Sequence, residues 1–515
     1  MNKKFEELVF YQIYPKSFCD GNGDGLGDFR GIISKIDYLK SLGVNAVWIT
    51  PCFKSPNVDN GYDISDYRDT QDDMGTLSEA EEMIKEFHRN GIAVIFDLVA
   101  NHSSTEHKWF KESRKSKDNP YRDYYIWRET PPNDWYSLFG GKAWQYDELT
   151  NEYYLHSFAV EQADLNWDNP KVREEMKAVV DYWIEKGVDG FRCDVLDMIS
   201  KDWVLNKNGN GPHMHEYIRE LFGRESTNGI FTVGECWSAD AENVKSFCQK
   251  DRKELTTVFA FQHLCVDNGR FCTDKPVMKE VCRRLSDWQE LLQKSDILPT
   301  LFFENHDQPR SVSRFGNDEE FRYESATMLG TLILTLRGVP FIYQGEEIGI
   351  TNSWHNDLSE FIDIESVNYC NFNKDRISND DLLKTVNYCG RDNARHMIPW
   401  DDKTESVWIA PYSKQNKINV KNDLSSEKSI YDFYSKLIKL RTQEEVLKYG
   451  KYKLIDLNDK YYVYSREYNG DEITVVINFD KESNLKLNYG KVILTNYDKV
   501  CDELKPYQVV IFKKS

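Results

Sequence analysis

The fold is decided by the stretch Gly190-Phe191-Arg192-Cys193-Asp194-Val195 and by three others that likewise place an acidic residue or its polar neighbours where an apolar strand ends. They are Asp97-Leu98-Val99-Ala100-Asn101-His102, Thr232-Val233-Gly234-Glu235 and Phe303-Glu304-Asn305-His306-Asp307. In each, apolar, β-branched or aromatic residues lead into polar ones, as where a buried strand runs out into a loop. The carboxyl ends of parallel barrel strands carry the chemistry. The chain is therefore predicted to be an enzyme built on clustered carboxylates.

The rest of the chain extends this pattern to eight strands. They are predicted at residues 9–13, 44–50, 92–99, 188–194, 230–235, 257–261, 300–305 and 339–344. Intervening segments such as 29–42 and 78–89 repeat apolar residues every three or four positions, as amphipathic helices do. Eight alternating strands and helices close a (β/α)8 TIM barrel, so the predicted fold class is α/β.

Two long intervals interrupt the alternation, and both follow a predicted strand, which places them at the catalytic end of the barrel. Residues 101–167 are too many for a simple loop and are predicted to form a small inserted domain after strand 3. Residues 346–427 follow the eighth strand and contain Arg391-Asp392-Asn393-Ala394-Arg395. From residue 444, short alternating runs predict a C-terminal antiparallel β-sandwich. The predicted domains are a catalytic barrel of 1–100 and 168–443, an insert of 101–167 and a β domain of 444–515.

The amino-acid composition limits which binding partners and which cellular compartment are expected. The 515 residues carry a formal net charge of −19, which repels phosphate backbones and anionic membranes, so neither nucleic acid nor membrane partners are expected. The eleven cysteines have no paired spacing, which indicates reduced thiols. The start, Met1-Asn2-Lys3-Lys4-Phe5-Glu6-Glu7, lacks the apolar core of a secretory signal, and no apolar run reaches membrane-spanning length. We expect a soluble, cytoplasmic monomer.

The acids at the strand ends can form a hydrolytic pair. Arg192 and Asp194 point to the same side of their strand, and a neighbouring guanidinium keeps a carboxylate ionised, as a nucleophile needs. Glu235, among other acids and apolar walls, is expected to have a raised pKa and to hold a proton. Such a pair, about 5 to 5.5 Å apart, cleaves glycosidic bonds with retention. Asp307 could stabilise the charged sugar. Each acid alone could equally be a structural ion pair or a helix cap.

His102 and His306 lie beside these acids, which raises a metal site as an alternative. No second His stands at helical metal-ligand spacing, and no Cys pair accompanies them. Neutral imidazoles that hydrogen-bond sugar hydroxyls fit the pattern better, although a His at a strand end is often purely structural.

The four stretches, in this order, resemble the signature regions of the α-amylase superfamily of glycoside hydrolases, family 13. The likeness is closest to its oligo-1,6-glucosidase and α-glucosidase branch and extends over nearly the whole chain. Further stretches that resemble this branch are Tyr11-Gln12-Ile13-Tyr14-Pro15, Asp59-Asn60-Gly61-Tyr62-Asp63-Ile64-Ser65-Asp66-Tyr67, Asp164-Leu165-Asn166-Trp167 and Tyr343-Gln344-Gly345-Glu346-Glu347.

The resemblance implies a role for individual residues. Asp194 is implied to be the nucleophile that forms a β-glucosyl ester, Glu235 the general acid and base, and Asp307 the transition-state stabiliser. The residues implied to hold the sugar at the cleavage subsite are Arg192, His102, His306 and Tyr62, the last as a stacking platform. Asp59 and Arg395 are implied to close the pocket behind a terminal glucose, and Phe158 and Gln162 to occupy other pocket positions. A closed pocket admits only a chain end, so single glucose units should be released.

The preferred linkage rests on Val195, which resembles the residue associated with α-1,6 preference where α-1,4 enzymes often have Thr. A methyl in place of a hydroxyl changes a contact by about 1 to 3 kcal/mol, so a graded preference for isomaltose-type substrates is expected. The chain departs from the branch at Arg395-His396-Met397-Ile398-Pro399-Trp400, where Arg-Thr-Pro-Met-Gln-Trp is usual, and at Glu304, where Asn is frequent. Both departures could alter the leaving-group side of the pocket.

Other functions stay open within and outside this family. A hydrolase of sucrose or of trehalose 6-phosphate has the same architecture, and the phosphate would need a basic cluster on the aglycone side. A broad α-1,4 and α-1,6 glucosidase with transglycosylation is a further alternative. A catalytically inactive binding or scaffold protein would be expected to lose the acids that this chain keeps.

The loop Asp20-Gly21-Asn22-Gly23-Asp24-Gly25-Leu26-Gly27-Asp28 places oxygen ligands on alternate residues. This is the first part of an EF-hand-like calcium loop, although position twelve is Gly31 and not Glu. The candidate ligands of a structural Ca²⁺ are Asp20, Asn22, Asp24, Asp28 and the carbonyl of Leu26, and related glucosidases bind calcium in a similar loop. A turn-rich loop without a metal is the alternative.

Overall fold

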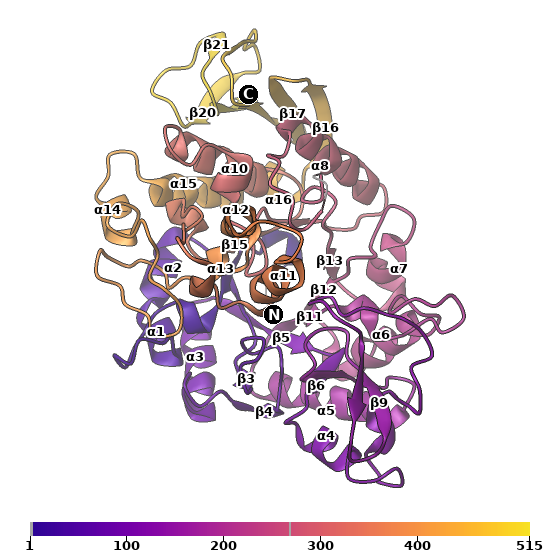
Figure 1. Ribbon diagram of the computed structural model, residues 1–515. Coiled ribbons are helices and arrows are strands. Elements are labelled where there is room, and N and C mark those ends of the chain that lie inside the picture. Colours follow the sequence, from indigo (N-terminus) through magenta and orange to yellow (C-terminus); the bar gives the residue numbers. More distant parts are fainter. Residues whose placement is uncertain (1–3, 267–268, 515) are drawn as a thin grey trace.

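The computed structural model describes residues 4–266 and 269–514, and an eight-stranded parallel sheet lies at its centre (Figure 1). In spatial order the strands are β13 (Thr257–Phe259), β12 (Phe231–Glu235), β11 (Gly190–Asp194), β5 (Ala93–Val99), β2 (Ala46–Ile49), β1 (Phe10–Ile13), β15 (Val339–Tyr343) and β14 (Thr300–Leu301). Neighbours pair in parallel; Phe10, for example, is in register with Ala46 on one side and Phe341 on the other. The predicted (β/α)8 barrel and its eight strands are confirmed.

Side chains join the two ends of the pairing order, β13 and β14. Thr257 Oγ1 donates to the carbonyl of Leu298 at 2.5 Å, and Thr300 Oγ1 donates to the carbonyl of Val258 at 3.1 Å. The barrel therefore closes through threonine hydroxyls at this seam.

Aromatic rings fill the barrel interior beneath the strand ends. Phe10 stacks on Phe341 with ring centroids 4.6 Å apart, and Phe259 meets Phe341 at 4.8 Å. Trp48 adjoins Phe259 at 5.5 Å. Gly190 lets β11 approach β12, because a Cβ atom there would lie 1.9 Å from the carbonyl oxygen of Phe231. The strand ends thus rest on a solid core.

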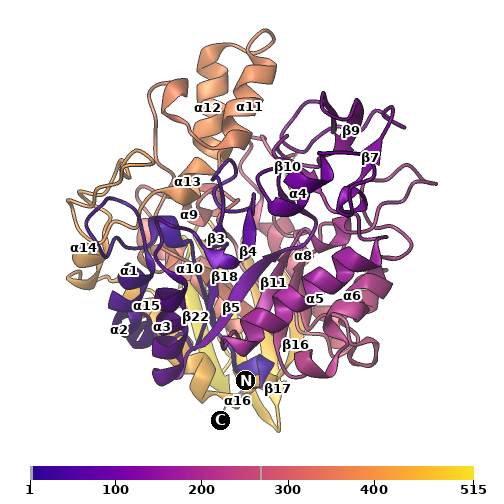
Figure 2. The ribbon, with the colours of Figure 1, turned by 90° about the horizontal axis from the view of Figure 1, so that it is seen from below.

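Helices cover the outside of the barrel and also occur in the segments attached to it (Figures 1 and 2). They are α1 (Phe29–Ser34), α2 (Ile36–Leu42), α3 (Leu77–Arg89), α4 (Lys108–Ser113), α5 (Pro170–Glu185), α6 (Met214–Phe222), α7 (Val244–Cys248), α8 (Met278–Gln293), α9 (Ser311–Phe315), α10 (Arg322–Thr335), α11 (Ile364–Asn373), α12 (Asn379–Cys389), α13 (Asp392–Arg395), α14 (Val420–Leu424), α15 (Ile430–Gln443) and α16 (Glu445–Tyr449). Short 3-10 helices are η1 (Phe5–Glu7), η2 (Pro15–Ser17), η3 (Arg122–Tyr124), η4 (Leu196–Met198), η5 (Glu225–Thr227), η6 (Lys250–Arg252), η7 (Glu346–Ile348) and η8 (Leu358–Glu360).

The two helices expected from apolar periodicity are both present, with one difference. Segment 29–42 is divided into α1 and α2, because Lys35 leaves the helical conformation with φ −107° and ψ 7°. Segment 78–89 is α3, whose start is fixed by reciprocal hydrogen bonds between Thr76 and Glu79, a capping box.

Two segments project from the same end of the barrel (Figure 2). After β5, β6 (His102–Ser104) pairs with β10 (Gln162–Asp164), while β7 (Trp127–Arg128), β9 (Glu152–Leu155) and β8 (Trp144–Asp147) form a small antiparallel sheet. After β15, α11 and α12 form a helical hairpin. A further short pair, β3 (Phe53–Lys54) and β4 (Asp66–Thr70), follows β2.

The C-terminal part is an antiparallel sheet, as the alternating runs predicted. Its order is β16 (Lys451–Leu457), β17 (Tyr461–Tyr468), β18 (Asp471–Asn478), β22 (Val509–Lys514) and β20 (Lys491–Thr495). One face packs with the two-stranded sheet of β19 (Ser483–Asn484) and β21 (Glu503–Leu504) around Val476, Leu504 and Val510. The other face meets the barrel, where Ser286 Oγ of α8 lies 2.7 Å from the hydroxyl of Tyr452.

Cys193 in β11 and Cys236 directly after β12 are buried free thiols, and the reduced state of all eleven cysteines stays a prediction. Within residues 4–266 and 269–514, no helix is both long and apolar enough to cross a membrane. The N-terminal stretch assessed for a secretory signal begins at Met1, and its first three residues lie outside the described residues.

Candidate active site

A cavity of about 750 Å³ opens at the carboxyl ends of the barrel strands. Eight residues singled out from the sequence line it, namely Asp59, Tyr62, His102, Phe158, Asp194, Val195, Glu235 and Asp307. The other four, Gln162, Arg192, His306 and Arg395, are buried and contact members of this wall. The structure therefore brings all the predicted sugar-site residues to one place.

Arg192 joins three carboxyl groups at the base of the cavity. Its Nη1 lies 2.8 Å from Asp97 Oδ1 and 2.8 Å from Asp194 Oδ1, and its Nη2 contacts Glu235 Oε2. One positive charge cannot balance three buried carboxylates, so at least one of them holds a proton near neutral pH. Asp97 was not among the predicted site residues, although it stands in the quoted strand end and alternation points it inward.

Burial sets the protonation of this group. Burial raises the pKa of Asp194 to about 7 and that of Glu235 to about 7, in both cases against the lowering effect of Arg192. Like charges on neighbouring acids contribute to both of these raised pKa values. The raised pKa of Glu235 is confirmed. The expectation that the adjacent Arg192 is enough to keep Asp194 ionised is wrong, because the effect of desolvation on its pKa outweighs that of the guanidinium.

Trp237 lies next to Glu235 in the cavity wall, toward the cavity mouth. Its Nε1 donates to Glu235 Oε1 at 2.9 Å, and its ring is stacked on Phe261 with centroids 3.9 Å apart. Trp237 is about half exposed, so one face of the ring is covered and the other faces the opening. Sequence reasoning missed this residue, although an aromatic two positions after Glu235 was a usable signal.

Asp307 is held in its ionised form. Its oxygens lie 2.9 Å from His306 Nε2, 3.1 Å from Arg391 Nη1 and 3.0 Å from Arg395 Nη2. Burial raises the pKa of Asp307, but His306 and the two guanidinium groups lower it more, and the pKa lies well below its usual range. Asp307 therefore keeps a negative charge beside the Asp194 and Glu235 pair.

His306 is a neutral hydrogen-bonding ring. Gln12 Nε2 lies 2.8 Å from its Nδ1, which makes Nδ1 an acceptor and places the proton on Nε2, near Asp307 and the hydroxyl of Tyr62 at 2.6 Å. Burial lowers the pKa of His306. The Tyr62 ring stacks on His306 at 5.2 Å, which fixes its orientation at the cavity wall.

Asp59 pairs with Arg391 in the cavity wall, which corrects the expected pairing with Arg395. Arg391 Nη2 lies 3.0 Å from Asp59 Oδ1, whereas Arg395 Nη1 contacts Asp363 at 2.6 Å and its Nη2 contacts Asp307. The two arginines are four positions apart, one helical turn, so the sequence could not tell which faces Asp59. Arg391 also lies over the ring of Phe139 at 4.9 Å.

The inserted segment contributes Gln162, His102 and Phe158 through one strand pairing. Register places Asp164 opposite His102 and Gln162 opposite Ser104. Gln162 Nε2 donates to Asp59 Oδ2 at 3.1 Å and lies 3.2 Å from His102 Nε2, while Phe158 packs on His102 at 5.0 Å. Burial lowers the pKa of His102 to about 4, so the ring is neutral, as expected.

Val195 adopts a left-handed backbone with φ 33° and ψ 47°, directly after Asp194. This conformation is strained for a β-branched residue and marks sites where the surrounding structure imposes it. Here it turns the chain from β11 into η4 and leaves Val195 on the cavity wall.

The two departures from the family pattern lie behind the wall, which corrects the expectation that they alter the leaving-group side. Glu304 is buried and bonded to Arg310 Nη1 at 3.0 Å and to the amide of Ser311. His396 Nδ1 lies 2.7 Å from the carbonyl of Ala410. Neither is among the described residues that line the cavity.

The candidate calcium loop is held by its own backbone amides. Asp20 accepts from Asn22, Gly23 and Gly25 at 3.0, 2.6 and 2.8 Å, and Asp24 accepts from Leu26 at 2.9 Å. Asp28 caps α1 by accepting from Gly31 at 2.6 Å. Across residues 4–266 and 269–514, no three His, Cys, Asp or Glu side chains converge at metal-binding distance. The oxygen donors suit Ca²⁺ in type, and the loop would have to reorient them to bind it.

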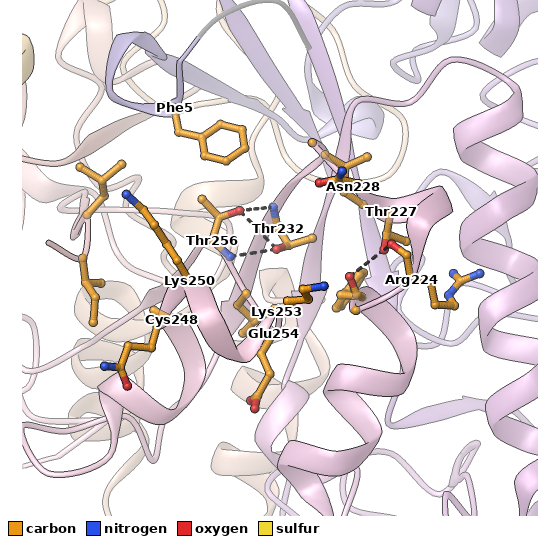
Figure 3. Close-up of a pocket in the computed structure, with 18 of the residues that line it drawn as sticks. Phe5, Arg224, Thr227, Asn228, Thr232, Cys248, Lys250, Lys253, Glu254 and Thr256 are labelled. Carbon is orange, nitrogen blue, oxygen red and sulfur yellow. Dashed lines mark hydrogen bonds between the residues drawn. The ribbon is translucent and has the colours of Figure 1, made fainter. Parts of the chain in front are cut away.

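A second cavity, of about 730 Å³, lies at the opposite ends of β12, β13 and β14 (Figure 3). The hydroxyls of Thr232 and Thr256 near its centre accept from each other's backbone amides at 3.0 and 3.2 Å. Glu254, on its wall, is bonded to His215 at 2.7 Å. Thr232, Thr256 and Glu254 thus already have hydrogen-bond partners within the protein.

A (β/α)8 barrel whose strand ends bring two carboxyl groups onto one guanidinium in a cavity has the arrangement of a glycoside hydrolase. Comparison with known proteins places it further: the model of the α-amylase catalytic domain matches residues 12–450, and the chain belongs to this family. It is 42% identical to an oligo-1,6-glucosidase of Parageobacillus thermoglucosidasius, over 99% of this chain and 98% of the relative.

Two other relatives are named for different activities. A trehalose-6-phosphate hydrolase of Bacillus subtilis (strain 168) is 40% identical over 99% of this chain and 98% of its own. The crystal structure of a trehalulose synthase from Pseudomonas mesoacidophila MX-45 superposes with a TM-score of 0.94 at 37% identity, covering 99% of both chains. The barrel is therefore shared by enzymes with different products, and the choice among them lies in the cavity.

Proposed function

We propose that this enzyme is a retaining, exo-acting α-glucosidase that hydrolyses terminal, α-1,6-linked glucose from short oligosaccharides such as isomaltose. One observation carries the proposal: Arg192 brings Asp194 and Glu235 together in a cavity whose far end is closed by the Asp59–Arg391 ion pair. Two carboxyls on one guanidinium are close, as in retaining enzymes, where about 5 to 5.5 Å separates them.

The reaction uses the two protonation states of this pair. Glu235, protonated, donates its proton to the glycosidic oxygen while Asp194, ionised, attacks the anomeric carbon; the aglycone leaves as an alcohol and a β-glucosyl ester forms. Glu235, now ionised, takes a proton from water, which hydrolyses the ester and restores both groups. Asp307, ionised beside them, stabilises the positive charge that develops on the sugar ring.

The ring is held by neutral donors around the cleavage point. His102 and His306 are both uncharged and buried in the wall, and Tyr62 presents its ring beside them. Such groups donate to or accept from hydroxyls without adding charge to the site. Because Arg391 and Asp59 block the inner end, only the non-reducing end of a chain can enter, and glucose is the product.

The α-1,6 preference is supported by Val195 in the wall next to the nucleophile and by the relatives, several of which are 1,6-glucosidases by name.

The wall favours a neutral aglycone over a phosphorylated one. Its carboxyl groups are Asp59, Asp194, Asp197, Glu235, Asp307 and Glu365, against the cations Lys207, Arg270 and Arg391. Arg270 is already held by Glu365 at 2.7 Å.

The deciding experiment is a substrate panel. We expect the highest kcat/KM for isomaltose, with maltose, sucrose and trehalose lower, and no preference for trehalose 6-phosphate over trehalose. A clear preference for the phosphate ester would instead make this a trehalose-6-phosphate hydrolase. Equal rates on maltose and isomaltose, with oligosaccharide products at high substrate, would indicate a broad glucosidase with transglycosylation.

We also propose that the loop of Asp20, Asn22, Asp24, Leu26 and Asp28 binds a structural Ca²⁺. The support is its alternating oxygen donors, of the kind that Ca²⁺ prefers. Binding to the folded state alone raises stability by about 2.7 kcal/mol at a hundred times the dissociation constant. Chelation should therefore lower the Tm, and Ca²⁺ should restore it, with no such response in Asp20→Ala. An unchanged Tm would leave the loop as a metal-free turn.

A reducing compartment and a monomeric state complete the proposal. Buried Cys193 and Cys236 stand directly beside the nucleophile and the acid in sequence. Free thiols at such positions suit a cytoplasmic protein, because the cytoplasm keeps cysteines reduced. The described residues of one chain furnish both acids and the closing ion pair, so a partner is not needed to complete the site. Light scattering of the purified protein tests the oligomeric state.

A further inference from the structure

Two apolar side chains stand exposed at the mouth of the catalytic cavity. Tyr136 is 66% exposed and Leu138 60% exposed, yet both also line the cavity. Tyr136 lies in an isolated bridge and Leu138 in the turn that follows it, and both side chains line the same cavity. Large apolar groups left open to water at a cavity mouth indicate a binding surface.

The segment that carries them is rigid. Tyr136 and Lys142 form an antiparallel bridge, and the amide of Ala143 donates to the carbonyl of Trp135 at 2.9 Å. Lys142 Nζ lies 4.5 Å from the centre of the Tyr136 ring and 2.9 Å from Asp134. One face of the Tyr136 ring is thus covered, and the ring is oriented before any ligand arrives.

The neighbouring loop supports this segment from the barrel side. Trp135 stacks on Trp203 at 5.3 Å, and its Nε1 donates to the carbonyl of Asn206 at 3.2 Å. Leu138 is fixed by its amide, which donates to the carbonyl of Ser157 at 2.9 Å. Loops that follow β5 and β11 are therefore tied together along one side of the mouth.

We propose that Tyr136 and Leu138 form a binding surface for the sugar units beyond the leaving group, so that the enzyme prefers isomalto-oligosaccharides of three or more glucose units. This rests on the proposed function. Pyranose rings have apolar faces that pack on aromatic and aliphatic side chains. A protein partner seated on the same two residues would cap the opening through which substrate enters, so the surface fits a chain that continues out of the cavity.

The test compares substrates that do and do not reach the surface. Tyr136→Ala should lower kcat/KM for isomaltotriose and isomaltopentaose by about three- to tenfold, the range expected for one aromatic contact. The same variant should change kcat/KM for isomaltose and p-nitrophenyl α-glucoside by less than about twofold, since these end before the surface. Tyr136→Phe should behave as the wild type, because the ring and not the hydroxyl makes the contact.

Tyr146→Ala is the matched control. Tyr146 is another exposed tyrosine of the inserted segment, 42% exposed, and its hydroxyl is bonded to Asn151 at 2.8 Å away from the cavity wall. It should leave every substrate unaffected. Equal losses of Tyr136→Ala on short and long substrates, or no loss on any, would overturn the proposal. So would dimers in the wild type that disappear in Tyr136→Ala, because the surface would then bind a second copy.

A binding measurement distinguishes a failure of this proposal from a failure of the proposed function. If the wild type hydrolyses none of these glucosides, the proposed function fails. The surface is still tested by the affinity of Asp194→Asn for isomaltotriose, measured by calorimetry with and without Tyr136→Ala. An unchanged affinity would refute the surface even in an active enzyme.

Discussion

Replacing Glu235 by Gln removes the proposed proton donor and keeps its shape. General acid catalysis contributes about 10²- to 10⁴-fold, and the full loss should appear with isomaltose, whose leaving alcohol needs a proton. With p-nitrophenyl α-glucoside, whose phenolate leaves without full protonation, the loss should be much smaller. The ratio of the two losses reports the role of Glu235 as an acid.

The pKa of Glu235, which burial raises to about 7, also predicts how the effect of Glu235→Gln on the rate changes with pH. A group with that pKa is about nine-tenths protonated at pH 6 and about one-tenth protonated at pH 8. The advantage of the wild type over Glu235→Gln on isomaltose should therefore shrink about tenfold between these pH values. Asp194 must be ionised, so activity is also lost as pH falls through its own pKa, and the wild-type profile should be bell-shaped.

Steady-state kcat/KM from pH 4.5 to 9 on both substrates, with Tm as a check on folding, measures all of this. Equal losses on the two substrates would show that Glu235 does not protonate the leaving group. A wild-type rate that stays flat across this range would refute the pairing of Asp194 with Glu235.

Three further variants test other parts of the site. Asp194→Ala should lose about 10⁴-fold or more in kcat with an unchanged Tm, because the covalent step disappears; turnover near that of the wild type would exclude Asp194 as nucleophile. Arg391→Met should lower the free energy of unfolding in urea by about 3 to 5 kcal/mol, because Asp59 loses the partner that balances its buried charge. A change below about 1 kcal/mol would show that Asp59 takes up a proton at little cost. Val195→Thr should shift the ratio of maltose to isomaltose hydrolysis toward maltose by about 5- to 150-fold, the span of a 1 to 3 kcal/mol contact, and an unchanged ratio would remove Val195 from linkage selection.

The barrel and its acids were predictable because both leave short-range signals. Each strand is a compact apolar run, and Asp194, Glu235 and Asp307 stand where such runs end. Alternation along β11 was enough to predict that Arg192 and Asp194 share a side, and their 2.8 Å contact confirms it.

What the sequence could not provide depended on three-dimensional distance. Arg391 and Arg395 are equivalent by spacing, and only the course of the chain after β15 decides which one faces Asp59. Desolvation of Asp194 depends on how completely its neighbours exclude water, so its raised pKa could not be read from the adjacent Arg192. Glu304 and His396 were placed near the leaving group by analogy, whereas packing turned both toward Arg310 and Ala410.

The contact between Asp59 and Arg391 joins residues 332 positions apart. Such a distant closure forms late in folding, since a long loop must be ordered before the contact can form. During synthesis, a nascent chain that has not yet extended past Arg391 lacks the Asp59–Arg391 ion pair of its substrate cavity. The ability to distinguish chain ends from chain interiors is therefore acquired only when the segment after β15 is added to a barrel whose strands are already complete.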